Sequence, residues 1–154
     1  ERAAHKTAQV PVMTLTRIQD MYFARNLVEC QAYRYLAERK SVPGEAVHAN
    51  ESLRDAANTG SLLNFVDSDV RFHRALIDAL GSPRITKVHH ALINEMRLCL
   101  VQVQAHELLD PAIIATEHAS ILDAIREGKV DLAARCGQAH LDHAQMQLTG
   151  DMTA

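Results

Sequence analysis

Residues 61–80, which read SLLNFVDSDVRFHRALIDAL, decide the fold of this chain. Their apolar side chains recur at steps of three and four residues, the spacing of an α-helix with one buried face. The stripe runs through Leu62, Phe65, Phe72, Leu76 and Leu80. Asp69 and His73 fall on the same stripe, one helical turn apart. The stretch therefore predicts a helix that directs a carboxylate and an imidazole into the protein core.

The same periodicity recurs along most of the sequence, and strand-like alternation is absent. Capping residues, glycines and prolines predict further helices at about 14–40, 45–58, 83–106, 111–127 and 129–148. Short connections make neighbouring helices antiparallel. We predict an all-α antiparallel bundle of six or seven helices over residues 15–149, with residues 1–14 as a linker or N-terminal arm.

Composition excludes several functions for this chain. The 154 residues suit one domain, and a net charge of −3 with interspersed charges leaves no basic stripe for nucleic acid. No apolar run is long enough to span a membrane, and the N-terminus lacks the apolar core of a signal peptide. The three cysteines are widely spaced, which favours reduced thiols. We therefore expect a cytoplasmic protein without membrane contact.

His118 and His140 lie on the inner stripes of two later helices, so that four inward polar residues could meet. One carboxylate and three imidazoles suit a divalent transition metal such as Zn²⁺, Ni²⁺, Mn²⁺ or Fe²⁺, and ligand type does not choose among these. Each residue alone could instead be a hydrogen-bonded core residue or part of an ion pair. Taken jointly, Asp69, His73, His118 and His140 favour a metal site, with His143 as a competing ligand.

Arg25 places a guanidinium on the inner stripe of the first predicted helix. Arginine binds carboxylates with two hydrogen bonds, so Arg25 could hold a small organic acid beside a metal ion. It could also pair with Glu29, four residues on, and both roles are compatible. Arg97 and His89 are weaker candidates for contact with the same effector.

Catalytic signatures are missing: the sequence has no recognisable Ser–His–acid spacing, glycine-rich phosphate loop or HExxH motif. We predict no catalytic residue. A small metal-dependent hydrolase or lyase remains one alternative, because open metal positions beside an arginine would suit such chemistry. A metal-free dimerisation bundle is the other.

Four segments together resemble a known family. They are MYFARNLVE at 21–29, DVRFH at 69–73, Glu117-His118 and Ala139-His140-Leu141. In order and spacing they are similar to the FCD domain, the C-terminal effector-binding and dimerisation domain of the FadR branch of GntR-type bacterial transcription regulators. The chain departs from the family pattern at Gly81-Ser82 and at Gly128-Lys129, both beside helix starts.

This resemblance implies a homodimer in which Asp69, His73, His118 and His140 hold the metal ion and Arg25 helps to hold an organic acid. It also implies DNA binding through a winged helix-turn-helix domain only. Residues 1–14 are too short to contain that domain, so we expect it to be absent from this chain. The chain is expected to be a metal-dependent sensing and dimerisation domain, not an enzyme.

Overall fold

The computed structural model describes residues 10–150, which form seven α-helices and contain no strand. The helices are α1 (Leu15–Glu38), α2 (Gly44–Thr59), α3 (Leu62–Asp78), α4 (Pro83–Gln102), α5 (Ala105–Leu108), α6 (Pro111–Glu127) and α7 (Val130–Gly150). The predicted all-α bundle is confirmed. Residues 1–9, most of the predicted N-terminal arm, lie outside the described residues.

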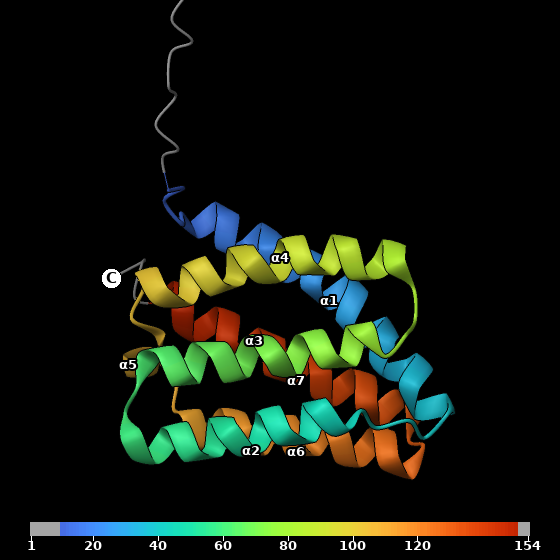
Figure 1. Ribbon diagram of the computed structural model, residues 1–154. Helices are drawn as coiled ribbons and strands as arrows, with labels where there is room; N and C mark the ends of the chain where they lie inside the picture. The colour runs from blue at the N-terminus through green and yellow to red at the C-terminus, as the bar shows by residue number, and fades with distance from the viewer. Residues whose placement is uncertain (1–9, 151–154) are drawn as a thin grey trace, which may run out of the picture.

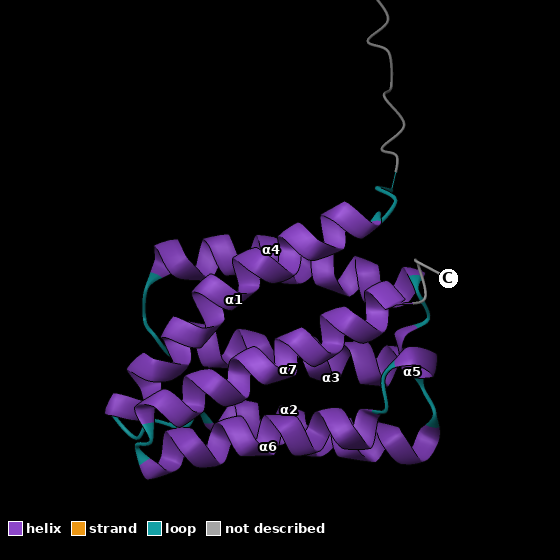
Figure 2. Ribbon diagram, turned by 180° about the vertical axis from the view of Figure 1, so that it is seen from behind, coloured by secondary structure: helices purple, strands orange, loops and turns teal. Residues whose placement is uncertain are grey.

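The long helices form two layers of three (Figure 1). Helices α4, α3 and α2 lie in one layer, and α1, α7 and α6 lie in the other, as the view from behind also shows (Figure 2). The central helices α3 and α7 therefore have neighbours on both sides within their layers, and they contribute Asp69, His73 and His140, three of the four residues that converge at the site described below. No helix within residues 10–150 is both long enough and apolar enough to cross a membrane.

Helix ends follow the capping signals in the sequence. The hydroxyls of Thr14, Ser61 and Ser82 and the carboxylate of Asp110 accept hydrogen bonds from backbone N–H groups of the first turns of α1, α3, α4 and α6. Gly128 ends α6 with a left-handed φ of 73°. These local interactions explain why most predicted boundaries agree with the structure within a few residues.

The predicted helix over residues 83–106 is wrong at its C-terminal end. Helix α4 ends at Gln102, and Gln104 adopts a left-handed φ of 52° before the single turn α5. This break turns the chain so that Ala105 and Leu109 are buried in the core. At the other end of α4, Ile85 is 37% exposed, because the first turn borders a groove and not the core.

Helices α1 and α7 are in close contact where Gly137 faces Tyr33. A Cβ atom at position 137 would lie 2.5 Å from Cδ2 of the Tyr33 ring. This distance is shorter than a van der Waals contact, so the ring or the helix would have to shift. Gly137 therefore permits this contact. The contact matters for the site because the Tyr33 hydroxyl lies 3.0 Å from the buried carboxylate of Glu29.

Candidate metal centre

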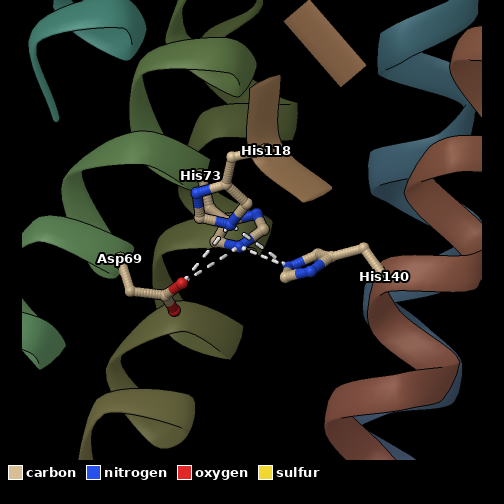
Figure 3. A group of neighbouring side chains, drawn as sticks. All are labelled: Asp69, His73, His118 and His140. Carbon is tan, nitrogen blue, oxygen red and sulfur yellow. Dashed lines mark hydrogen bonds and ion pairs between the residues drawn. The ribbon is translucent and has the colours of Figure 1, made fainter. Parts of the chain in front are cut away.

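Four buried side chains from three helices converge in the centre of the bundle (Figure 3). Asp69 and His73 lie one turn apart on α3, His118 comes from α6 and His140 comes from α7. Each residue is no more than 6% exposed. One ligand-type atom from each lies within 4.8 Å of the others, so the structure brings together the four residues that the sequence singled out.

The distances between the inward atoms suit a metal ion. His140 Nε2 lies 3.3 Å from both His118 Nε2 and His73 Nε2. Asp69 Oδ1 lies 3.4 Å from His118 Nε2 and 3.8 Å from His73 Nε2. A tetrahedral ion with bonds of about 2.0–2.1 Å separates its ligand atoms by roughly 3.3 Å. Four of the six separations are therefore close to that value, and all six lie within 4.8 Å.

Protonation of His73 and His118 at this centre is unfavourable. Burial lowers the pKa of His118 well below its ordinary value, and the neighbouring His140 and His73 lower it further. Burial also lowers the pKa of His73, although Glu29 acts in the opposite direction. Both imidazoles are therefore neutral near pH 7, which is the form that binds metals. A group of neutral nitrogens facing a carboxylate fits a bound cation.

Arg25 and Glu29 form a buried ion pair next to this centre. Arg25 Nε lies 2.8 Å from Glu29 Oε1, and Arg25 Nη2 lies 3.3 Å from Oε2. The same carboxylate contacts Tyr33 Oη, His73 Nδ1 and His89 Nε2, each at 3.0 Å. Burial would raise the pKa of Glu29, but Arg25 and His73 outweigh it and hold this pKa well below its usual range. Glu29 therefore joins α1 to α3 and α4.

The other predicted site residues lie elsewhere. Arg97 is not at the centre: its exposed guanidinium pairs with Asp67, with Nη2 2.7 Å from Oδ1. His89 is fully buried but lies against Glu29 and is not among the four converging residues. His143 is also outside the four, and its Nδ1 lies 2.6 Å from Glu117 Oε1.

Comparison with known proteins identifies the family. The model of the FCD domain matches residues 20–143. This chain belongs to the FCD domain family. It is 32% identical over 124 residues to the HTH-type transcriptional repressor NanR of Cronobacter sakazakii and to the same-named protein of Salmonella newport. These matches cover 79% of this chain but only 45% of each relative, so the chain spans about half the length of these curated relatives.

Solved structures share the fold of this FCD domain. The metal-free FCD domain of the protein TM0439 superimposes with a TM-score of 0.76 over 93% of this chain and 99% of that chain, at 17% identity. A protein from Rhodococcus sp. RHA1 named as a GntR transcriptional regulator superimposes with a TM-score of 0.77, at 23% identity. The superposition covers 96% of this chain and 72% of that chain. The family and the named relatives agree with the prediction of a regulatory domain and not an enzyme.

A very small cavity lies beside the four converging residues. Arg25, Asp69 and His140 line it together with Tyr22, and its other walls are apolar or aliphatic. Its volume is about 10 Å³, which is room for about one water molecule. Any larger molecule that binds next to the centre must therefore displace the surrounding side chains.

Glu117 is not among the predicted site residues, yet it contacts two histidines. Its Oε2 lies 2.8 Å from His140 Nδ1, and its Oε1 contacts His143. Burial would raise the pKa of Glu117, but hydrogen bonds and charge from the two histidines lower it. The sequence signal was the three-residue spacing of His140 and His143, which places both imidazoles on one face of α7, where a single carboxylate can reach both.

The metal-free domain should become less stable as the pH falls below about 6.5. Because the pKa values of His73 and His118 are lower in the fold than in the unfolded chain, the unfolded chain binds more protons below that pH. The stability that depends on these neutral imidazoles is therefore complete above about pH 6.5. It decreases as the pH falls toward the pKa values that the two histidines have in the folded state. We expect a loss of about 2 kcal/mol between pH 7.5 and 5.5, measured by urea unfolding.

A His48→Gln variant is the control for this titration, because His48 is exposed and pairs with Glu51 on the surface. It should keep the pH dependence of the parent, whereas His118→Gln should reduce it. Equal stability of the parent at pH 7.5 and 5.5 would contradict the assignment of neutral buried imidazoles.

Proposed function

We propose that this FCD domain binds one divalent transition-metal ion through Asp69, His73, His118 and His140. The observation that carries the proposal is the convergence of three imidazole nitrogens and one carboxylate oxygen in a buried site. Zn²⁺, Ni²⁺, Mn²⁺ and Fe²⁺ all accept this ligand set. A bound ion would supply positive charge that attracts an anionic ligand to the adjacent cavity.

The proposed effector is a small organic acid that binds between the metal site and Arg25. Hydrogen bonds to Glu29 use Nε and Nη2 of the guanidinium, and no hydrogen bond among residues 10–150 uses Nη1. Since the cavity holds only about one water molecule, the acid would bind a more open arrangement than the one described. Preference for the open form would shift the population toward it, which is how a sensing domain responds.

We propose that the domain serves this sensing role in a GntR-type transcriptional regulator of the FadR branch. Support comes from the family and from the relatives named as HTH-type repressors. In such a protein a separate N-terminal domain would bind DNA, because this chain lacks a basic stripe for phosphate contact. Binding of organic acids without turnover, in calorimetry and product analysis, would separate this function from a metal-dependent hydrolase or lyase.

Metal binding should raise the melting temperature of the parent. At a free metal concentration of about 100 times Kd, the free energy of unfolding should rise by roughly 2.7 kcal/mol. For a domain of this size that corresponds to an increase in melting temperature of about 5–10 °C. Chelator should remove that gain. His73→Gln and His118→Gln should melt at the same temperature with and without metal, whereas His48→Gln on the surface should behave like the parent. Identical metal responses in His118→Gln and the parent would contradict the assigned ligands.

We further propose that the domain forms a homodimer through the outer face of α1 and the adjoining face of α4. Phe23, Leu27 and Tyr35 follow one face of α1 and are 65%, 59% and 41% exposed, and Val88 on α4 is 53% exposed. A groove of about 480 Å³ runs beside Leu27 and Tyr35 toward Ile85. An apolar surface of this extent is typical of an interaction site.

Leu27→Asp should weaken the dimer by placing a charge in the proposed interface. We expect sedimentation velocity to show a shift toward monomer with little change in melting temperature, because Leu27 is not in the core. Leu63→Asp on α3 is the matched control, since Leu63 is also 59% exposed but lies on another face. A parent that is monomeric at high concentration would refute the dimer.

A further inference from the structure

Two of the three imidazoles in the centre have a carboxylate on the side away from the other ligands. His73 directs Nδ1 to Glu29 Oε2 at 3.0 Å, and His140 directs Nδ1 to Glu117 Oε2 at 2.8 Å. In both residues Nε2 is the atom that faces the centre. The two carboxylates come from α1 and α6, so different parts of the bundle hold the two rings.

We propose that Glu29 and Glu117 are positioning residues that fix the orientation and the tautomer of His73 and His140 and thereby set the metal affinity of the centre. The inference rests on the metal site proposed above. Each carboxylate acts through a histidine and does not itself face the centre.

The chemistry of the imidazole ring explains this role. A neutral imidazole carries one proton, which can reside on either nitrogen. An ionised carboxylate only accepts hydrogen bonds, so it holds the proton on the Nδ1 atom that faces it. The lone pair is then on Nε2, where a metal ion can use it. Without the carboxylate, the ring can rotate or move its proton to Nε2, and either change removes a ligand.

His118 provides an internal comparison, because it lacks such a carboxylate. Its Nδ1 is buried without a hydrogen-bond partner among residues 10–150. Its ring instead stacks on Phe72, with centroids 3.6 Å apart and planes 4° apart. Packing therefore orients His118, whereas contacts with carboxylates orient His73 and His140. The Tyr33 hydroxyl also lies 3.3 Å from His73 Nδ1. Removal of a carboxylate should affect only the imidazole that it contacts.

Glu117 is the better position for the test. Glu29 is fully buried and also holds Arg25, so its substitution would combine loss of stability with loss of metal affinity. The side chain of Glu117 is 25% exposed, and it makes hydrogen bonds only with His140 and His143 in the described part of the chain. Substitution there should leave the fold intact.

Glu117→Ala should weaken Zn²⁺ binding about 10- to 100-fold, measured by competition with a chromophoric chelator. In the metal-free protein, long-range ¹H–¹⁵N spectra should show His140 protonated on Nδ1 in the parent and no longer uniformly so in the variant. Glu117→Gln keeps an acceptor oxygen and should retain part of the affinity. Glu51→Ala removes the exposed partner of His48 and serves as the control, with parental affinity expected.

The two readouts separate the possible failures. If the parent binds Zn²⁺ and Glu117→Ala binds it equally well, the positioning role is overturned and the metal site stands. The role is also overturned if the affinity falls while the tautomer of His140 is unchanged. If the parent binds no Zn²⁺ at all, the proposed metal function fails, and the inference fails with it. Loss of affinity together with the change of tautomer supports it.

Discussion

Replacing Glu29 by Gln should lower the free energy of unfolding of the metal-free domain by about 3–5 kcal/mol. Glu29 is completely buried, and its carboxylate neutralises the guanidinium of Arg25, which is itself only 1% exposed. The guanidinium cannot lose its charge in the variant. The buried guanidinium would then face an amide of nearly the same size that carries no compensating charge. His73, His89 and Tyr33 would lose the same ionised acceptor.

The matched control is Glu95→Gln, which removes the carboxylate from an ion pair on the surface. Arg17 Nη2 lies 2.9 Å from Glu95 Oε1, and the two side chains are 44% and 31% exposed. The free energy of unfolding should therefore fall by only about 0–1 kcal/mol. Urea unfolding near pH 7 in the presence of chelator measures both variants. Glu29→Gln and Glu95→Gln with equally small effects would show that the buried pair contributes no more than the exposed one.

Gly137→Ala should destabilise the domain by about 2–3 kcal/mol, although helix propensity alone predicts the opposite sign. Glycine within a helix is usually less favourable than alanine by about 1 kcal/mol. Here the added Cβ would lie 2.5 Å and 2.6 Å from Cδ2 and Cε2 of the Tyr33 ring. The ring is fully buried, so it can move away only by disturbing the packing of α1 on α7. Such overpacking is destabilising.

Gly44→Ala at the start of α2 is the control for helix propensity, because no atom lies within 4 Å of a Cβ added there. Its stability should equal or slightly exceed that of the parent in the same urea experiment. A Gly137→Ala variant more stable than the parent would mean that α1 and α7 do not approach as closely as described.

Much of the fold could be predicted because its signals are local. The stripe through Phe65, Asp69 and His73 and the caps at Thr14 and Asp110 each involve residues within a few positions of one another. The four converging residues could be proposed for the same reason, since helical spacing places them on inner faces. That Arg25 and Glu29 pair was also an expectation from their four-residue spacing, and the structure confirms the pair.

Other features depend on contacts between distant segments. Gln104 adopts a left-handed conformation that no glycine marks, so the break between α4 and α5 has no clear sequence signal. The sequence makes Arg97 a weaker candidate for effector contact, yet its guanidinium pairs with Asp67 on the surface. Glu117 contacts His140 only because α6 packs against α7 at this register. The carboxylates behind the histidines therefore became evident from the structure and not from spacing alone.

The metal content of the untagged domain, purified without chelator, tests the central proposal most directly. Elemental analysis of the parent, with His118→Gln purified in parallel, would report the ions bound per chain. The four converging residues predict about one transition-metal ion per chain in the parent and far less in the variant. A parent that contains no metal, and takes up none when Zn²⁺ or Ni²⁺ is added, would contradict the proposal.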